Sequence, residues 1–487
     1  MEILILDLKK QIIEALNLED ITPDDIDTNA PLFVEGLGLD SIDALELIVL
    51  MEKQYGIKLE DPGKSKEIFK SIATMAEYIE KHRTKYPSRM EKIYVTGYGI
   101  ISSLGRGVPA TLEALRNRRS GIGPLRWLET IHSHLPCAEV PFSTEELREL
   151  AGIPAGNITT RTALMGMIAL EEALEQAGWH VNRPARPVLI SGTTVGGMEN
   201  TERYFLDFME NDTKNDYILA HDCGVCTQMI ADRFGGFDML STLSTACSSA
   251  ANAMIMGADM IRTGRTSFAV AGGSECLSKF HLNGFNTLKI LDKDPCRPFD
   301  DTRAGLNLGE GAAYLVLESE ASVKARGVKP ICVLSGYGNA CDAYHQTASS
   351  PEGDGAVLSM NKALTEAGLK PGDIGYVNAH GTGTPNNDES EGKALMRVFG
   401  ADGVPPVSST KSFTGHTTSA AGSVEAVISI LALLHDFLPV NLNFLHPMEM
   451  LSFGPVTDER PVRPLRHVMT NSFGFGGNDT TCIFSKI

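Results

Sequence analysis

Three turns, far apart in the sequence, each place a reactive side chain just after an apolar run. Cys247 follows the run 239–243, and His380 and His416 follow two later runs, in turns rich in Gly and Thr. Short apolar runs that end in such turns are typical of buried strands. A single histidine is usually structural, but two histidines and a cysteine in the same kind of turn are hard to explain by packing alone.

The turn at Cys247 leads from a predicted strand into a predicted helix. Small residues flank the cysteine on both sides, and residues 250–261 are rich in Ala, Met and Ile at helical spacing. The start of a helix presents unpaired N–H groups and a partial positive charge. Both favour the thiolate over the thiol, so the pattern predicts a nucleophilic sulfur. The alternative interpretation is an inert cysteine buried in the core.

The three turns resemble those of the elongating β-ketoacyl-acyl carrier protein synthases, and the resemblance covers roughly residues 92–487. It implies a catalytic site made of Cys247, His380 and His416, with Lys411 beside them. Thiolases would use a second cysteine, and the chain-initiating synthases an asparagine in place of His416, so neither pattern fits.

The resemblance implies a reaction as well as a site. This is the decarboxylative Claisen condensation of an acyl thioester with malonyl-carrier protein, which gives β-ketoacyl-carrier protein in fatty acid or polyene/polyketide synthesis. The alternative is a catalytically silent chain-length partner subunit with a fused docking bundle. Such subunits lack the nucleophile, so Cys247 counts against that interpretation.

Further site residues follow from the same resemblance. It implies that Glu310 is an acid near Lys411, and that Thr382 and Thr384 hold the pantetheine arm. It also implies an oxyanion hole formed by the backbone N–H groups of Cys247 and Phe475. Phe473 and Phe475 would form the gate of the acyl pocket. Val195 would line that pocket, although it is equally well interpreted as a plain core residue. No metal or redox cofactor is expected.

Strand and helix patterns alternate along residues 92–487, which predicts an α/β fold. A faint internal repeat places similar Gly-containing motifs at 95–99 and 334–338. The resemblance implies an α/β thiolase-like layered fold with two similar halves, about 92–330 and 331–487, normally assembled as a homodimer.

Two motifs depart from the family's pattern. Residues 303–307 read Arg-Ala-Gly-Leu-Asn where Arg-Asp-Gly-Phe-Val is usual. Residues 471–477 resemble the family's Gly-rich gate loop, and they are followed by Asn478 and Asp479 where Thr-Asn is usual. These departures affect the expected substrate more than the expected chemistry.

The docking surface for the carrier protein also departs from the family. The family's docking helix is normally basic, but Arg161 is the only base in residues 157–170. Lys214 and Lys289 are further candidates for this surface.

Residues 1–82 differ in character from the rest of the chain. Residues 1–85 contain 18 acidic and 10 basic side chains, and their apolar periodicity predicts helices over about 3–16, 41–55 and 71–81. These features predict a small all-α four-helix bundle.

The stretch 38–43, Gly-Leu-Asp-Ser-Ile-Asp, resembles the attachment site of acyl carrier proteins. This implies 4′-phosphopantetheine bound covalently to Ser41, a phosphopantetheinyl transferase as a partner, and acyl- and malonyl-carrier proteins as substrates. Asp40, Asp43 and Glu46 would present a negative face to partner enzymes. The alternative is a docking module that is never modified, in which Ser41 is only the N-cap of its helix.

Residues 83–91 are mostly charged and polar, include Pro87, and are expected to link a carrier domain at 1–82 to a ketosynthase domain at 92–487. The net charge of −18 argues against nucleic acid or an anionic membrane as a partner. We find no run of about 18 apolar residues and expect a soluble, cytoplasmic protein. The nine cysteines are expected to be reduced thiols rather than a disulfide framework or a metal site.

Overall fold

In the computed structural model the chain forms two compact units, Met1–Glu91 and Lys92–Ile487. The structure describes residues 2–16, 18, 21–33, 36–55, 57, 59, 65, 67–82, 92–181, 184–211, 213–458 and 464–487. The predicted linker at 83–91 lies outside the described residues.

The first unit contains the helices α1 (Glu2–Ala15), α2 (Ser41–Tyr55) and α4 (Ile72–His82). Each lies within a residue or two of a helix predicted from apolar periodicity. Their buried faces share one apolar core, to which Leu8, Leu47 and Met75 contribute. The described residues therefore establish three packed helices.

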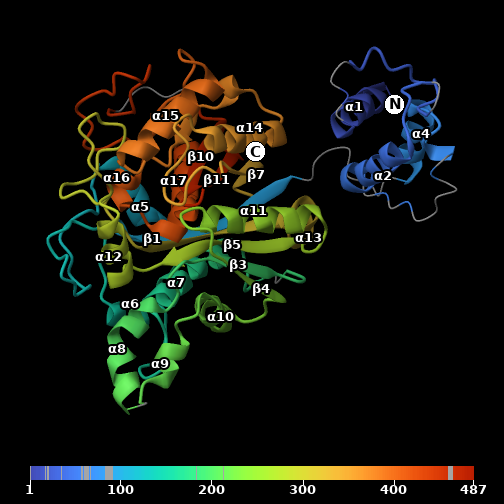
Figure 1. The fold of residues 1–487 in the computed structure, drawn as a ribbon. Helices are drawn as coiled ribbons and strands as arrows, with labels where there is room; N and C mark the ends of the chain where they lie inside the picture. The colour runs from blue at the N-terminus through green and yellow to red at the C-terminus, as the bar shows by residue number, and fades with distance from the viewer. Residues whose placement is uncertain are drawn as a thin grey trace. The chain divides into compact units, whose positions relative to one another are not determined.

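The second unit is an α/β fold built on an 11-stranded sheet (Figure 1). Its strands are β1 (Ile93–Ser102), β2 (Gly105–Arg106), β3 (Val188–Gly192), β4 (Met239–Leu243), β5 (Phe268–Glu275), β6 (Gly311–Ser319), β7 (Cys332–Cys341), β8 (Tyr376–Asn378), β9 (Val407–Ser408), β10 (His467–Gly474) and β11 (Asn478–Ser485).

The helices of the second unit lie between and around these strands. They are α5 (Gly107–Arg116), α6 (Thr144–Leu150), α7 (Arg161–Gln176), α8 (Met198–Asn211), α9 (Asn215–Leu219), α10 (Cys223–Phe234), α11 (Ser249–Arg262), α12 (Lys279–Thr287), α13 (Glu320–Arg326), α14 (Asp354–Ala367), α15 (Pro385–Phe399), α16 (Lys411–Thr414) and α17 (Ala421–His435), with the 3-10 turns η1 (Pro371–Asp373) and η2 (Thr418–Ala420).

The sheet consists of two similar halves. Its strand order is β4-β3-β5-β6-β1-β7-β11-β10-β8-β9, with β2 paired to β1. In the first half β3 pairs in parallel with β4 and β5, and β6 pairs antiparallel with β5 and β1. The second half repeats this pattern with β8 between β9 and β10, and with β11 between β10 and β7. The repeated motifs at 95–99 and 334–338 fall on the equivalent strands β1 and β7, which pair with each other.

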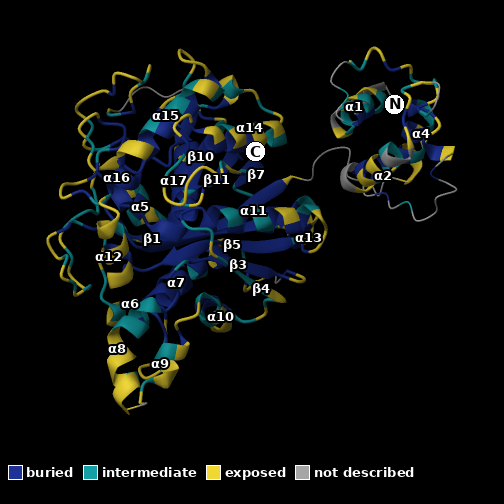
Figure 2. Ribbon diagram, in the orientation of Figure 1, coloured by how far each residue is buried: buried dark blue, intermediate teal, exposed yellow. Residues whose placement is uncertain are grey.

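Two buried helices, α11 and α17, pack against each other in the centre of the unit and share the main core with both halves of the sheet. Helix α7 covers the first half and α14 the second. Figure 2 shows most strands as buried, with β4 more exposed, whereas much of α8 and α9 is exposed. Helix α17 is buried over most of its length. Because α11 and α17 each follow an edge strand of their half, they bring the turns after β4 and β9 into the interior.

One helical segment among the described residues, Thr418–His435, is long and apolar enough to cross a membrane, which differs from the sequence expectation. The fold accounts for this composition, because 89% of the segment is buried within the protein. A helix that is apolar on all sides is expected at the centre of a large core.

Candidate active site

Cys247 lies in a tight turn between β4 and α11. Ala246 adopts a left-handed conformation with a φ of 52°, which is uncommon for residues other than glycine. Ser249 steadies the turn, because its hydroxyl oxygen accepts a hydrogen bond from the N–H of Thr245 at 2.9 Å. The sharp bend predicted from the small flanking residues is therefore present.

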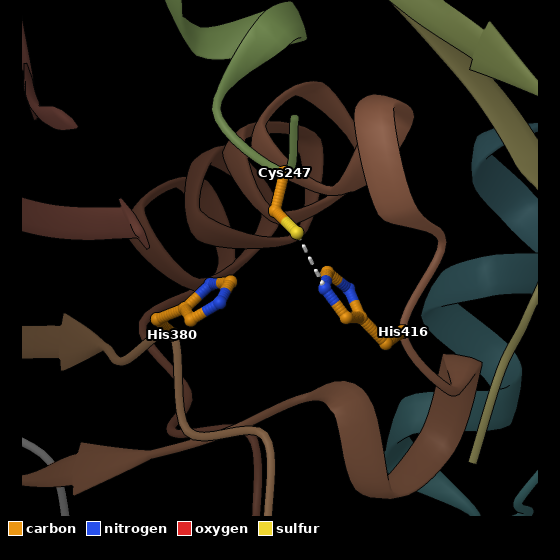
Figure 3. Close-up of side chains that lie close together, drawn as sticks. All are labelled: Cys247, His380 and His416. Atoms are coloured by element: carbon orange, nitrogen blue, oxygen red, sulfur yellow. Dashed lines mark hydrogen bonds between the residues drawn. The ribbon is translucent and has the colours of Figure 1, made fainter. Parts of the chain in front are cut away.

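The structure brings the three predicted reactive side chains together. The sulfur of Cys247 lies 3.0 Å from Nε2 of His416 (Figure 3). The rings of His380 and His416 are nearly perpendicular, with centroids 5.3 Å apart. All three residues are buried, and one atom from each lies within 4.8 Å of the others. The three come from the turns after β4, β8 and β9.

Lys411 lies behind His380 and determines which ring nitrogen carries the proton. Its Nζ lies 3.2 Å from Nδ1 of His380 and also forms a buried ion pair with Glu425. An ammonium group can only donate, so Nδ1 accepts and the proton of a neutral His380 is on Nε2. His380, in the turn after β8, therefore presents an Nε2–H donor at the site rather than an acceptor.

Both histidines are held in the neutral form. Burial, and next the positive charge of Lys411, hold the pKa of His380 and of His416 well below the ordinary value. A neutral imidazole has one donor and one acceptor nitrogen. The pair can therefore hydrogen-bond to a substrate oxygen without adding charge to the site.

The thiol of Cys247 is not the resting thiolate that its position before a helix predicts. Burial raises the pKa of Cys247 to about 11, and this outweighs the positive charge of Lys411 and the N–H groups of Phe475 and Cys247, which act in the opposite direction. Because His416 Nε2 lies within hydrogen-bonding distance, the histidine can take up the thiol proton as the sulfur reacts.

A cavity of about 370 Å³ opens onto the three reactive side chains. Its lining includes Thr382 and Thr384, whose hydroxyl oxygens are 2.8 Å apart. Phe473 and Phe475 also line it, whereas Val195 is buried elsewhere and is not among its lining residues. The cavity is large enough for a thioester and the end of its arm.

The gate loop, residues 474–477, connects β10 to β11 and contacts α12, the end of β7 and the segment after β7. The ring of Phe475 stacks on Phe285 with centroids 5.7 Å apart. The N–H of Gly476 donates to the carbonyl oxygen of Gln346 at 2.8 Å, and its carbonyl oxygen lies 3.5 Å from the thiol of Cys341. The loop is thus anchored to the segment that follows β7.

The acid predicted beside Lys411 is a different residue. Glu310 does not contact Lys411 but forms a buried ion pair with Arg161, and it accepts hydrogen bonds from the N–H groups of Val140 and Leu277. The carboxylate that pairs with Lys411 is Glu425 on α17. Burial raises the pKa of Glu425 to about 7, and the ammonium of Lys411 opposes that rise.

The basic residues considered for carrier docking have different environments. Arg161 is buried in its pair with Glu310, so it cannot be part of a docking surface. Lys289 is exposed and lines the cavity. Lys214 lies about 5.4 Å from the ring centroids of Tyr204 and Tyr217.

Comparison with known proteins identifies the family. Residues 90–322 match the family described as Beta-ketoacyl synthase, N-terminal domain, and residues 331–445 match Beta-ketoacyl synthase, C-terminal domain. The chain belongs to the β-ketoacyl synthase family. In addition, residues 7–79 of this synthase match the family described as Phosphopantetheine attachment site, so the synthase includes a domain that carries 4′-phosphopantetheine on a serine.

Several relatives match the synthase over most of their length. It is 33% identical over 422 residues to the 3-oxoacyl-[acyl-carrier-protein] synthase 2 of Vibrio cholerae, a match that covers 81% of this chain and 99% of that protein. The enzyme of the same name from Staphylococcus aureus is 30% identical over 413 residues, which is 82% of this chain and 99% of that protein.

Solved structures confirm the predicted thiolase-like fold of the synthase unit. The ishigamide ketosynthase/chain length factor is similar with a TM-score of 0.75 at 30% identity, over 82% of this chain and 100% of that one. A β-ketoacyl synthase from Burkholderia phymatum has a TM-score of 0.71 at 28% identity, again over 82% and 100%.

In the carrier unit of the synthase, the N-cap of α2 is Asp40 rather than Ser41. The N–H of Asp40 donates to Asp43 Oδ2 at 2.8 Å, and the N–H of Asp43 donates to Asp40 Oδ1 at 3.2 Å. This reciprocal arrangement is a capping box. It removes the interpretation of Ser41 as the helix cap, because Ser41 is the first residue of the helix itself.

Sequence reasoning about the synthase missed Glu425 and the role of Asn307. Glu425 is the one charged residue in the otherwise apolar part of α17, and such an isolated charge is a usable signal. Asn307, where the family has Val, is buried and accepts a hydrogen bond from the N–H of Cys296 at 2.6 Å. Its neighbour Leu306, where the family has Phe, lines the cavity.

Proposed function

We propose that this synthase condenses an acyl thioester with malonyl-carrier protein and releases CO2, giving β-ketoacyl-carrier protein for fatty acid or polyene/polyketide synthesis. The observation that carries the proposal is the contact of Cys247 Sγ with His416 Nε2 at 3.0 Å, in a cavity that His380 also lines. A nucleophile, a proton acceptor and a second neutral histidine are what the two half-reactions require.

The first half-reaction transfers the acyl chain to Cys247. The sulfur attacks the thioester carbon while Nε2 of His416 takes the thiol proton, and the carbonyl oxygen becomes an oxyanion. We infer that the backbone N–H groups of Cys247 and Phe475, which both lower the pKa of Cys247 in the resting site, stabilise that oxyanion. The leaving thiolate regains the proton from His416, and the acyl-Cys247 thioester remains.

The second half-reaction uses both histidines as donors. Because acyl-Cys247 has no thiol proton to donate, neutral His416 can now carry its own proton on Nε2 in place of Nδ1. Nε2–H of His380 and Nε2–H of His416 then hold the thioester oxygen of the malonyl substrate, which stabilises the enolate as the C–C bond to the carboxylate breaks and CO2 leaves. The enolate carbon attacks the carbonyl carbon of acyl-Cys247, and the released Cys247 thiolate takes up the Nε2 proton of His416 while Nδ1 regains one from solvent, which restores the resting site. One such hydrogen-bond donor is worth roughly a hundredfold in rate or more.

The reaction is tested by separating the two halves. Cys247→Ala is expected to abolish condensation but to retain slow malonyl decarboxylation, because the histidines remain. His380→Ala is expected to keep acyl transfer to Cys247 and to lose decarboxylation by roughly two orders of magnitude. Acyl transfer is followed by intact mass and decarboxylation by release of CO2.

Normal condensation by the Cys247→Ala variant would contradict the proposed nucleophile. Unfolding of the histidine variant, instead of a selective kinetic loss, would favour a structural role for His380. A silent partner subunit is the competing function, and it would show no acylation of Cys247 in the unaltered chain.

We further infer that residues 1–82 form a four-helix carrier bundle that a phosphopantetheinyl transferase modifies at Ser41. Two observations support this: the match to the attachment-site family and the capping of α2 by Asp40, which leaves the serine unnecessary for helix initiation. The bound arm supplies a thiol that carries the acyl chain. We also infer a cytoplasmic location, where the thiol substrates stay reduced.

We infer that the synthase unit works as a homodimer. Among the described strands, β4 is at the end of the sheet and has β3 as its pairing partner. Helices α8 and α9, which are largely exposed (Figure 2), carry the exposed apolar side chains of Phe205, Leu206, Met209 and Leu219. A strand at the edge of a sheet and an exposed apolar patch are typical of surfaces that a second subunit covers. The mass of the protein in solution tests this inference.

A further inference from the structure

Asn478, the first residue after the gate loop, joins three elements through its side chain. Its Oδ1 lies 2.8 Å from the hydroxyl oxygen of Ser248 and accepts from Nδ2 of Asn252 at 2.7 Å. Nδ2 of Asn339 on β7 donates to the same oxygen at 3.1 Å. Ser248 is the residue next to the nucleophile, and Asn252 lies in the first turn of α11. One amide oxygen of β11 is therefore tied to the N-terminus of α11.

The backbone of the gate loop lies directly against the nucleophile turn. A Cβ atom on Gly474 would lie 2.9 Å from the carbonyl oxygen of Thr245 and 3.1 Å from the hydroxyl oxygen of Ser248, so only glycine fits there without a shift. The next residue, Phe475, supplies the N–H that acts on the sulfur of Cys247. The two halves of the oxyanion hole thus belong to different segments that meet at this contact.

The backbone hydrogen bonds of the loop anchor it to Asp342 and Gln346 rather than to the nucleophile turn. The loop's glycines at 476 and 477 both have left-handed φ angles, of 82° and 74°, and glycine restrains the backbone least of all residues. Instead, the side chain of Asn478 at the end of the loop binds Ser248 in the nucleophile turn. This contact restrains the distance between the loop and that turn. Hydrogen bonds shared among several side chains are cooperative. Without the oxygen of Asn478, the donors Ser248, Asn252 and Asn339 would keep only their bonds to Thr245 and to one another, and none of these bonds reaches β11.

We propose that Asn478 is a positioning residue that keeps the N–H of Phe475 at the distance from Cys247 that oxyanion stabilisation requires. The inference rests on the proposed function, because it concerns the acyl-transfer half of that reaction. It also gives a role to the departure from the family at this position, since asparagine, unlike the usual threonine, extends a carbonyl oxygen to both Ser248 and Asn252.

The experiment compares Asn478→Leu with Asn478→Asp in the full chain. Leucine has a similar size but no acceptor, whereas aspartate retains an acceptor oxygen toward Ser248 and Asn252. Both variants carry Ser41→Ala so that no carrier thiol competes for the label. Octanoyl-coenzyme A is the acylation probe, followed by intact mass, and malonyl-coenzyme A is the decarboxylation probe, followed by CO2 release.

Asn478→Leu is expected to slow acylation of Cys247 by about tenfold or more while decarboxylation stays within about twofold, because the displaced donor stabilises the oxyanion of the acyl group and not the enolate of the malonyl substrate. Asn478→Asp is expected to recover most of the acylation rate. Asn283→Leu is the matched control, since Asn283 is exposed and its amide oxygen contacts His132 away from the cavity, and both rates should be unchanged.

Acylation at the unaltered rate in Asn478→Leu would overturn the proposal, and so would an equal loss of both rates. Should the leucine variant not fold, Asn478→Thr provides the same comparison, with acylation slowed and decarboxylation retained. Failure of the proposed function itself is distinguishable, because the Ser41→Ala parent would then neither acylate Cys247 nor release CO2.

Discussion

Arg161 and Glu310 act on the active site through the backbone. Glu310 follows Gly309, whose N–H donates to the carbonyl oxygen of His416 at 2.9 Å. The guanidinium of Arg161 donates to both carboxylate oxygens of Glu310, at 2.6 to 3.1 Å, in a site that is almost fully buried. The pair therefore holds the segment on which His416 rests and contacts no reacting atom.

A structural role for this pair predicts a particular pattern of stability. Glu310→Leu is expected to destabilise the protein by about 3 to 5 kcal/mol, because it leaves the Arg161 charge buried and unpaired. The double variant Arg161→Met/Glu310→Leu is expected to recover most of that loss. Chemical unfolding measures both, and the condensation rate per folded double variant should stay close to normal. A double variant that is stable but inactive would restore a catalytic role to Glu310.

Glu310 and Glu425 illustrate which residue roles a sequence motif can predict and which it cannot. The reactive side chains could be predicted because their turns combine residue type, spacing and glycine content. The acid beside Lys411 could not, since its neighbourhood depends on how α17 packs under the turn after β9. The same holds for Cys247, whose pKa depends on burial that a turn sequence does not reveal.

At the scale of elements, β11 begins with two polar side chains in succession, Asn478 and Asp479. Neighbouring residues of a strand point to opposite faces, so Asn478 contacts the nucleophile turn while Asp479 faces Asp342 on the other side. Burial, and then the charges of Asp342 and Glu391, raise the pKa of Asp479 to about 8. The strand therefore connects the gate loop to a buried carboxyl group, Asp479, with the partly buried Asp342 near it.

Because the pKa of Asp479 is raised in the folded protein, the free energy of unfolding should fall as the pH rises. Between the ordinary pKa of 3.8 and the folded pKa of about 8, the unfolded chain ionises at Asp479 while the folded chain keeps the proton. The resulting stability is fully present below 3.8 and is lost as the pH rises through the folded pKa. Asp479→Asn is expected to match the unaltered protein near pH 4 and to be more stable at pH 8 and above by a few kcal/mol, because a tenfold change in proton affinity corresponds to roughly 1.4 kcal/mol.

Urea unfolding across that pH range checks the expectation. Asp402→Asn, an exposed aspartate in the same unit, serves as the control and should follow the unaltered protein throughout. Parallel curves for Asp479→Asn and the unaltered protein would mean that Asp479 does not hold a proton in the fold.

The elements themselves were largely predictable, because periodicity reports which face of a segment is buried. The three helices of the first unit have bounds close to those expected. The repeat between β1 and β7 was visible in the sequence only as two short glycine motifs, since pairing rather than composition defines the equivalence of the two halves. The capping of α2 by Asp40 depends on backbone geometry that a serine-aspartate pattern leaves open.

At the scale of the whole molecule, a carrier unit and a synthase unit share one chain. Ten residues, 83–92, separate the end of α4 from the start of β1. Fully extended, they span at most roughly 35 Å, and Pro87 stiffens them. A short tether raises the effective concentration of one unit at the other when its length suits the geometry.

Tethering predicts intramolecular kinetics. After a phosphopantetheinyl transferase has modified Ser41, which intact mass confirms, elongation of an acyl chain on Ser41 is expected to be independent of protein concentration. A protease site introduced near Pro87 lets the same sample be measured before and after cleavage. Cleavage should slow elongation and make the rate rise with added free carrier. Equal rates at low concentration before and after cleavage would show that the tether has no catalytic role.

Cys341 is positioned to serve as a labelling site that reports on the gate loop. All nine cysteines are unpaired, and Cys341 is the exposed one, with its thiol against the carbonyl oxygen of Gly476 beside the gate. In the Ser41→Ala chain, which has no carrier thiol to compete, a thiol-reactive fluorophore would therefore attach there first, with no cysteine added or removed. The emission of that dye during a single turnover would record when the loop moves relative to each chemical step.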